Sequence, residues 1–491
     1  MAMRATRNRE RGFAVIMTAL TMMVTLPLVG LAVDLSILYL IRAKLYQAVD
    51  AAALAGGRAL ANGSTPAAQA SSAVTAATTF FNANFPTGYW GTSNIALAPP
   101  TVDSISTPNY RTVTVSATVT APLFFLRILG QNSAQISVSS QAGRRDVVMM
   151  LVLDRSSSMT TYPYQGTTPC VWMIQDAQQF LNYFAPGRDM IGLVVFGSSV
   201  FTYPPTATFT TPDANGNTVA SLIGNIACGG NTNSVEAMYQ AYNQLVVTNS
   251  TTRANIIVLM TDGRPNGFTG NYTTPTNLVK NANCTVGGQL IGEVEQWAGG
   301  PYATGETSGL SIETTTVVNA SRDGQAPSNT SGCAMDSNIA WAPPTDLSQM
   351  PTADVHGNSI IGNYSINNPN APYNGTPDNR NLSSPQQIEV ASVNALDNMG
   401  ITIRQNALLS PNIYTLALEG NAPNDPPDTL LLRKMANDPS MQNDPSATAQ
   451  LFWTQQNPGQ TVGYFADAPN AGQLSAAFNS IAERITVRLS K

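Results

Sequence analysis

Short apolar runs alternate with amphipathic segments along the C-terminal part of the chain. Runs of six or seven mostly apolar residues are typical of strands buried on both faces of a parallel sheet, and they lie at 147–153, 190–196, 255–260 and 413–418. Apolar residues recur at helical spacing in 172–184, 234–246, 386–409 and 474–489. This alternation predicts an α/β fold with a doubly wound, mostly parallel, Rossmann-type sheet. In such a sheet, ligands bind at the carboxyl ends of the strands.

A different pattern opens the chain. Residues 13–33 carry no charge, and as a helix they would span about 31 Å, which matches a bilayer core of roughly 30 Å. Good helix formers dominate residues 35–62, so we expect the helix to continue outward. Residues 1–62 would then hold a basic cytoplasmic end, a transmembrane helix at 13–33 and its helical extension. We expect Asp34 and Asp50 to be solvated at the interface.

Four arginines precede the apolar span and none follows it directly, which places the N-terminus in the cytoplasm by the positive-inside rule. The bulk of the chain would lie outside the inner (cytoplasmic) membrane. A cleaved signal peptide is the alternative. However, its apolar region is normally 7–15 residues long and ends at a nearby site with small residues, whereas Ala51–Ala55 lies too far downstream. An uncleaved single-pass anchor is the favoured interpretation.

Residues 63–145 predict a small α+β module with no evident chemistry. A polar, alanine-rich helix is expected at 65–81, and alternating polar and apolar residues predict half-exposed strands at 110–119 and 134–140.

Composition excludes several function classes. Only 11% of residues are charged and the net charge is −5, which argues against a nucleic-acid partner because such a partner requires a basic surface. The chain has one histidine, His356, so histidine-based zinc sites and most histidine acid–base chemistry are excluded. No nucleophile elbow or phosphate-binding loop occurs, and we expect no enzymatic activity.

Three loops at predicted strand ends carry only oxygen ligands. The first strand runs into Asp154, Ser156 and Ser158; the loop before the helix at 234 holds Thr232; the strand at 255–260 is followed by Asp262. Carboxylate and hydroxyl oxygens suit Mg²⁺ or Mn²⁺ and, less selectively, Ca²⁺. Two aspartates balance a charge of +2 and leave a position open for an incoming carboxylate. We therefore expect a protein partner that offers an Asp or Glu to the metal.

This D-x-S-x-S, Thr and T-D-G set resembles the metal-ion-dependent adhesion site of von Willebrand factor type A domains, with all five positions matched. The resemblance covers residues 146–263 and 386–491 and implies a metal-dependent binding domain. The alternative is a domain of this fold whose site is structural or carries no metal.

The N-terminal region has a resemblance of its own. The apolar span, Asp34 and the segment Ala43–Gly56 (AKLYQAVDAAALAG) are similar to the start of TadE/TadG-like proteins of Flp (Tad) pilus assembly. Met17 stands where a prepilin would carry a glutamate, which argues against processing as a pilin subunit. The resemblance implies a TadG-type role in assembling or anchoring a pilus, with a pilus-assembly component as the partner. A surface adhesin or matrix-binding protein that uses the same site is the competing hypothesis.

Residues 264–385 interrupt the α/β alternation and are rich in Asn, Thr, Gly and Pro. An insertion of this length is expected to be a surface elaboration rather than a plain loop. Because it leaves from a strand's carboxyl end, it would lie on the same edge as the metal loops, either shaping the partner-binding face or as a passive decoration. We expect His356, within it, to be a solvated loop residue.

The cysteines Cys170, Cys228, Cys284 and Cys333 lack C-x-x-C spacing, and an even number outside the cytoplasm predicts two disulfides. Three pairings are possible. We favour Cys170–Cys228, whose members flank the metal loops, and Cys284–Cys333 within the insertion.

Overall fold

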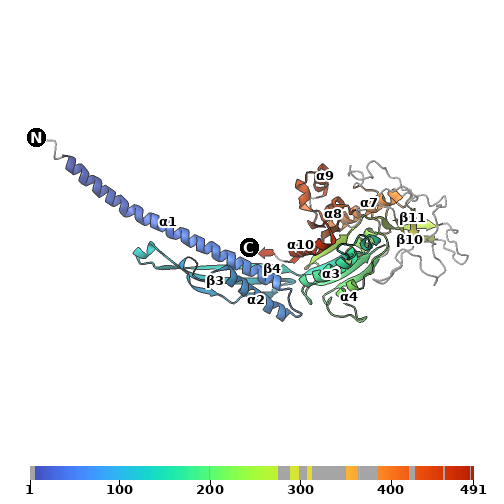
Figure 1. Ribbon diagram of the computed structural model, residues 1–491, viewed down its shortest axis with the longest axis horizontal. Coiled ribbons are helices and arrows are strands. Elements are labelled where there is room, and N and C mark those ends of the chain that lie inside the picture. The colour runs from blue at the N-terminus through green and yellow to red at the C-terminus, as the bar shows by residue number, and fades with distance from the viewer. Residues whose placement is uncertain are drawn as a thin grey trace. The chain divides into compact units, whose positions relative to one another are not determined.

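The computed structural model describes residues 6–197, 200–274, 288–297, 307–311, 350–362, 364, 385–419, 426–456, 459–486 and 488–490. The chain forms two compact units. Unit 1 comprises Met1–Arg144 and Val487–Lys491, and unit 2 comprises Arg145–Thr486. Figure 1 shows the course of the chain through both units.

Unit 1 packs two helices on an antiparallel sheet. Its helices are α1 (Thr6–Ala59) and α2 (Pro66–Asn84). Its strands are β1 (Ser93–Leu97), β2 (Thr101–Thr107), β3 (Tyr110–Pro122), β4 (Ser133–Arg145) and β14 (Arg488–Ser490), in the order β1-β3-β4-β14 with β2 also paired to β3. Every second residue of β3 is buried, as the alternating pattern predicts, and this face packs on apolar residues of α1 and α2.

The helix α1 is continuous through the predicted span and its extension. The helical segment Phe13–Ala59 is long and apolar enough to cross a membrane. Its most apolar stretch of 18 residues has a mean hydropathy of 2.1, and 17% of that stretch is buried. By length and composition, such a helix fits a membrane anchor or a signal sequence. From Ile41 to Ala53 the same helix supplies core residues of unit 1, so its two halves have different surroundings.

Asp34 lies where these halves meet, and the expectation that it is solvated is wrong. Its side chain is 1% exposed. The carboxylate accepts hydrogen bonds from the backbone N–H groups of Phe124, Phe125 and Leu126, at 2.9, 3.0 and 2.7 Å. Asp34 therefore fastens the connection between β3 and β4 to α1.

Unit 2 is built on a six-stranded sheet in the order β13-β12-β8-β5-β6-β7. The strands are β5 (Val147–Asp154), β6 (Met190–Phe196), β7 (Val200–Thr206), β8 (Ala254–Thr261), β12 (Asn412–Leu418) and β13 (Tyr464–Ala468). All pairings are parallel except that of β7 with β6. The mostly parallel sheet is thus found here, whereas the other two sheets are antiparallel.

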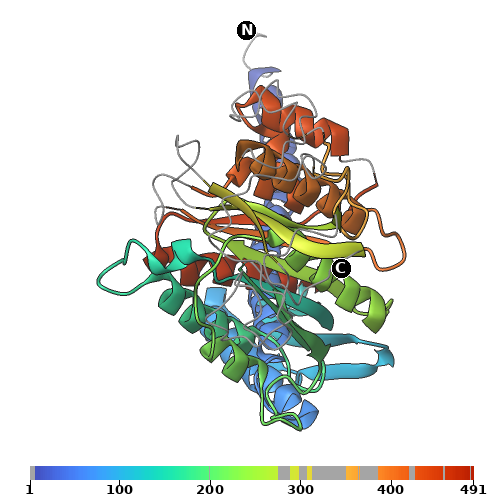
Figure 2. The same cartoon turned by 90° about the vertical axis from the view of Figure 1, so that its right-hand side faces the viewer.

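Helices cover both faces of this sheet (Figures 1 and 2). One face packs on α5 (Ser234–Thr248), α7 (Pro385–Arg404), α8 (Thr429–Ala436) and α9 (Ala447–Gln456). The other packs on α3 (Pro169–Phe180), α4 (Val219–Gly224) and α10 (Leu474–Thr486). Strand β5 supplies both cores: Val148, Met150 and Val152 face one, and the alternate residues face the other. This double burial explains its unbroken apolar run.

Short 3-10 helices complete the two units, namely η1 (Tyr89–Gly91), η2 (Leu126–Leu129), η3 (Ser157–Thr160), η4 (Leu181–Tyr183), η5 (Pro439–Asn443) and η6 (Ala471–Gln473). The helical stripe expected through Leu489 is too long. The helix α10 ends at Thr486, and Leu489 lies in β14, opposite Ala142 of β4.

The described part of the insertion contains a three-stranded antiparallel sheet of β9 (Gly267–Thr274), β10 (Gly288–Trp297) and β11 (Thr307–Ser311). The strand β9 contacts α5 and α7 of the main fold. The described residues of these three strands therefore form a sheet and not a plain loop.

His356 is not a solvated loop residue, so that expectation is wrong. Its Nε2 lies 2.6 Å from Oε2 of Glu236 in α5, and its ring stacks on Tyr239 with the centroids 3.3 Å apart. The backbone N–H of Val355 also donates to the carbonyl of Thr269 in β9 at 2.9 Å. The segment 350–362 is therefore attached both to α5 and to the small sheet.

Candidate metal centre

The five candidate ligands lie at the carboxyl edge of the main sheet. Asp154 is the last residue of β5, and Asp262 directly follows β8. These strands are parallel neighbours, with Leu153 opposite Met260, so both aspartates emerge at the same edge. Thr232 is in the loop before α5, where the side chain of Asn233 caps the helix by accepting the N–H of Glu236 at 3.3 Å.

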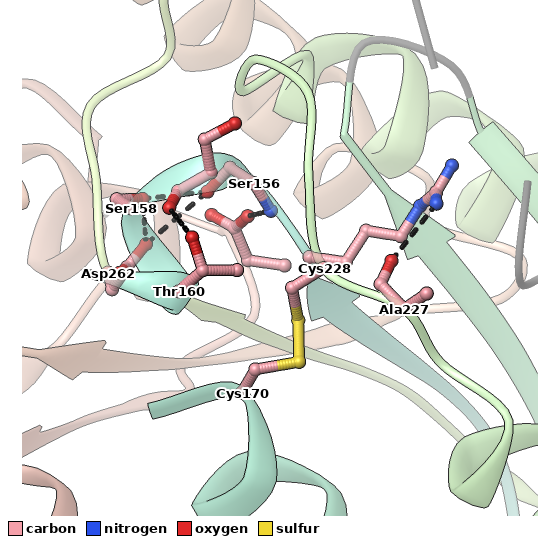
Figure 3. The surroundings of a disulfide bond; sticks show 10 residues. Ser156, Ser158, Thr160, Cys170, Ala227, Cys228 and Asp262 are labelled. Atoms are coloured by element: carbon pink, nitrogen blue, oxygen red, sulfur yellow. Dashed lines mark hydrogen bonds between the residues drawn. A yellow bond between two sulfur atoms is a disulfide. The ribbon is translucent and has the colours of Figure 1, made fainter. Parts of the chain in front are cut away.

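Three of the candidate oxygens form a compact triangle. The Oγ atoms of Ser156 and Ser158 are 2.8 Å apart, and they lie 3.4 and 2.7 Å from Oδ1 of Asp262. Figure 3 shows these side chains pointing toward one another. Ser156 is 2% exposed and Asp262 is fully buried. The loop after β5 and the end of β8 therefore bring their oxygens to one point.

Asp154, the last residue of β5, is fully buried. Its Oδ1 accepts the backbone N–H of Ser156 at 2.7 Å, and its Oδ2 accepts the hydroxyl of Thr261 at 2.5 Å. Burial raises the pKa of Asp154 from 3.8 to about 6, although both hydrogen bonds act to lower it. Ionised Asp154 is thus costly unless a positive charge compensates it.

Thr232 borders the same space from the loop before α5. A Cβ atom built on Gly263 would lie 3.7 Å from Oγ1 of Thr232 and 3.8 Å from Oγ of Ser158, so both hydroxyls face Gly263. Asn266 holds the loop: its Oδ1 accepts the N–H of Thr232 at 2.7 Å, and its own N–H donates to the Thr232 carbonyl at 3.2 Å. Sequence reasoning missed Asn266, which lies beyond the T-D-G motif and carries no ligand signature of its own.

Backbone hydrogen bonds join the loop after β5 to the loop before α5. The N–H of Ser157 donates to the carbonyl of Gly230 at 2.9 Å, and the N–H of Gly229 donates to the carbonyl of Arg155 at 2.5 Å. The disulfide Cys170–Cys228 adjoins them, with its Cα atoms 6.2 Å apart, as Figure 3 shows. The predicted pairing of these cysteines is confirmed. Cys284 and Cys333 lie outside the described residues.

The donor set fits a small divalent cation. Adjacent ligands of an octahedral Mg²⁺ at about 2.1 Å are separated by about 3.0 Å, and the triangle edges of 2.7, 2.8 and 3.4 Å span this value. Two aspartates supply a charge of −2. Within the described ranges, no three His, Cys, Asp or Glu side chains are grouped to hold a metal, so a cation site there must also draw on hydroxyl oxygens.

Comparison with protein families identifies a von Willebrand factor type A domain, whose family model matches residues 149–264. The match begins inside β5 and ends just beyond Asp262, so it contains all five candidate ligands. No curated protein sequence matches the chain.

Several solved structures resemble the chain at low identity. The PilB minor pilin of Streptococcus sanguinis is 13% identical, with 80% of this chain and 78% of that one covered and a TM-score of 0.31. The adhesive tip pilin GBS104 of Group B Streptococcus agalactiae is 12% identical (80% and 69% covered, TM-score 0.36). The vWF domain of the type V pili tip protein Mfa5 of Porphyromonas gingivalis is 14% identical (69% and 95% covered, TM-score 0.34). At these values the similarities assign no function to the chain.

Proposed function

We propose that this chain is a membrane-anchored binding protein whose von Willebrand factor type A domain recruits a protein partner through a divalent cation. The ligands would be Asp154, Ser156, Ser158, Thr232 and Asp262. The observation that carries the proposal is the hydroxyl–carboxylate triangle, together with a second aspartate, Asp154, that is fully buried.

The charges of the site explain how a partner would be recognised. Asp154 and Asp262 balance a divalent cation, while the three hydroxyls add neutral oxygens. When bound, the cation would act as a Lewis acid with a position available to a carboxylate of the partner. The residues of this chain hold the oxygens in place: the Ser156 N–H and the Thr261 hydroxyl orient Asp154, and Asn266 orients Thr232.

The cellular role rests on the N-terminal part of the chain. The continuous α1 supports an uncleaved anchor, because residues beyond the apolar span belong to the core of unit 1. The arginines that precede the span favour an inner-membrane anchor with the N-terminus in the cytoplasm. Together with the TadG-like segment Ala43–Gly56, this supports participation in Flp/Tad pilus assembly or anchoring. The partner would be a pilus-assembly component that presents an Asp or Glu.

Metal binding can be tested on the full chain in detergent by titration with Mn²⁺, with free Mn²⁺ followed by electron paramagnetic resonance. We expect one bound ion per chain, displaced by Mg²⁺ and absent in Asp154→Asn. Asp103→Asn is a matched control, because Oδ1 of the exposed Asp103 likewise accepts the N–H two residues ahead, that of Ile105, at 2.9 Å. Equal Mn²⁺ binding by wild type and Asp154→Asn would contradict the proposal.

The partner can be sought by crosslinking in native membranes with Mg²⁺ or with EDTA. A crosslink that requires Mg²⁺ and is lost in Asp154→Asn but kept in Asp103→Asn is expected. Deletion of the gene separates the two roles: loss of pili supports assembly, whereas normal pili with lost attachment would assign an adhesin instead.

A further inference from the structure

We propose that the connection between β3 and β4 inserts into the membrane surface beside α1, where it binds phospholipid. This inference rests on the proposed anchor and is independent of the metal site. The apolar tip, as we call it, consists of Phe124, Phe125, Ile128 and Leu129 around the short helix η2. Its side chains are 54%, 45%, 84% and 71% exposed, respectively.

Such exposure is unusual in a unit that has a core of its own. A cluster of large apolar side chains on a surface marks a contact with a partner or a membrane. Every second side chain of β3 is buried, up to the end of the strand. Just after the strand, the apolar side chains of Phe124 and Phe125 are exposed instead. The tip therefore presents apolar area that the fold of unit 1 does not require.

The tip is held at a defined level of α1. Asp34 accepts the N–H groups of Phe124, Phe125 and Leu126, as described above. One turn earlier on the helix, a Cβ atom added to Gly30 would lie 2.7 Å from side-chain atoms of Phe125, so the Phe125 side chain packs directly against the Gly30 backbone. These two contacts fix the tip against residues 30–34, which comprise the end of the apolar span and Asp34 directly after it.

Lipid is the occupant that this position favours. The large apolar side chains of α1 from Phe13 to Val33 are themselves exposed, and they adjoin the tip at Gly30. If α1 spans the bilayer, residue 30 lies about 6 Å below residue 34 along the helix. This places the Phe125 side chain, which packs on Gly30, at the depth of about 5–10 Å at which apolar groups enter the headgroup boundary. Arg127, exposed on the same tip, can reach the phosphates while its stem stays in the apolar layer.

The insertion can be tested with tryptophan variants of the full chain in phosphatidylcholine vesicles that contain brominated or unmodified acyl chains. Ile128→Trp and Leu129→Trp place a reporter on the tip. Ile105→Trp is the matched control, because Ile105 is 92% exposed and lies near the opposite end of β3. The emission of the wild-type protein in the same vesicles is subtracted, and flotation verifies that each protein is bound to vesicles.

We expect brominated lipid to quench the added emission of both tip variants by about twofold or more, as for a group within the acyl boundary, and to leave Ile105→Trp unquenched. Flotation of all variants without quenching at the tip would overturn the insertion while leaving the anchor intact. A blue-shifted emission without quenching would assign the tip to a protein contact and would also overturn it. Failure of the protein to float would overturn the anchor and the insertion together.

Discussion

Replacement of Asp154 by asparagine separates the stability of the metal-free domain from its proposed function. The asparagine amide retains Oδ1 as an acceptor for the Ser156 N–H. In the wild-type chain the Ser156 nitrogen lies 2.7 Å from Oδ1 of Asp154. It cannot accept the Thr261 hydroxyl with its nitrogen, but that hydroxyl has a second acceptor in the carbonyl of Gly263 at 3.2 Å. Asp154→Asn thus removes the charge with little loss of hydrogen bonding. Asp154→Ala, in contrast, would leave a buried donor without its partner.

The size of the effect follows from the pKa of Asp154. A rise from 3.8 to about 6 means that the ionised form is disfavoured in the folded state by about 3 kcal/mol. At pH 7.5 and without metal, wild type bears this cost and Asp154→Asn does not. For the residues of unit 2, an unfolding entropy of about 2.1 cal/mol/K per residue converts 3 kcal/mol into an increase in Tm of about 4 °C.

The stability of the metal-free domain should depend on pH through Asp154. Because the folded pKa lies above the unfolded one, the folded protein binds more protons between pH 4 and pH 6. Metal-free wild type should therefore gain stability as the pH falls from about 6 to about 4. The advantage of Asp154→Asn should shrink over the same interval. A divalent cation requires the ionised carboxylate, so Mg²⁺ should stabilise wild type most above pH 6.

Differential scanning calorimetry of the full chain in detergent measures these effects, with EDTA or Mg²⁺ at pH 5 and 7.5. Mg²⁺ at about 100 times its Kd should stabilise wild type by about 2.7 kcal/mol and leave Asp154→Asn unchanged. Asp103→Asn should respond to Mg²⁺ as wild type does. Melting of Asp154→Asn below wild type in EDTA at pH 7.5, or equal stabilisation of both proteins by Mg²⁺, would contradict a buried Asp154 charge that the cation compensates.

Three further predictions concern contacts that hold loops in place. The double variant Cys170→Ala/Cys228→Ala removes a disulfide that joins residues 58 positions apart. Its unfolding free energy in a denaturant titration should be about 4 kcal/mol lower than that of wild type. Its Mn²⁺ binding should also be weaker, because Gly229 and Gly230 adjoin the disulfide. Asp34→Ala removes the acceptor of three backbone N–H groups, so hydrogen exchange at residues 124–126 should become at least about tenfold faster while exchange at the α5 amides of unit 2 is unchanged. His356→Ala should increase protease cleavage within 350–362, because the segment loses its contacts with Glu236 and Tyr239; cleavage equal to wild type would contradict this role.

The sheet of unit 2 could be predicted wherever strands are buried on both faces. Strand β5 supplies apolar side chains to two cores, and this leaves an unbroken run in the sequence. The edge strands β7 and β13 lack such a run. Strand β7 contains Pro204 and Pro205, which an edge strand tolerates but which interrupt the apolar pattern, and β13 is a short YFADA segment at the other edge. Their position at the edges of the sheet explains why these strands lack the apolar run that marks the buried ones.

The candidate ligands could be identified because each lies next to a recognisable strand or helix end, where topology brings short motifs together. Residues whose role depends on a distant partner carry no such local signal. The bonds of Asp34 reach about 90 residues along the chain, and His356 contacts Glu236 across 120 residues. Asp34 and His356 are expected to be solvated when only their neighbours in sequence are considered. In the fold, both side chains contact segments that are distant in sequence. The loops that carry the candidate ligands have a local pattern, while the attachments of the apolar tip and of the insertion depend on tertiary contacts that no local pattern encodes.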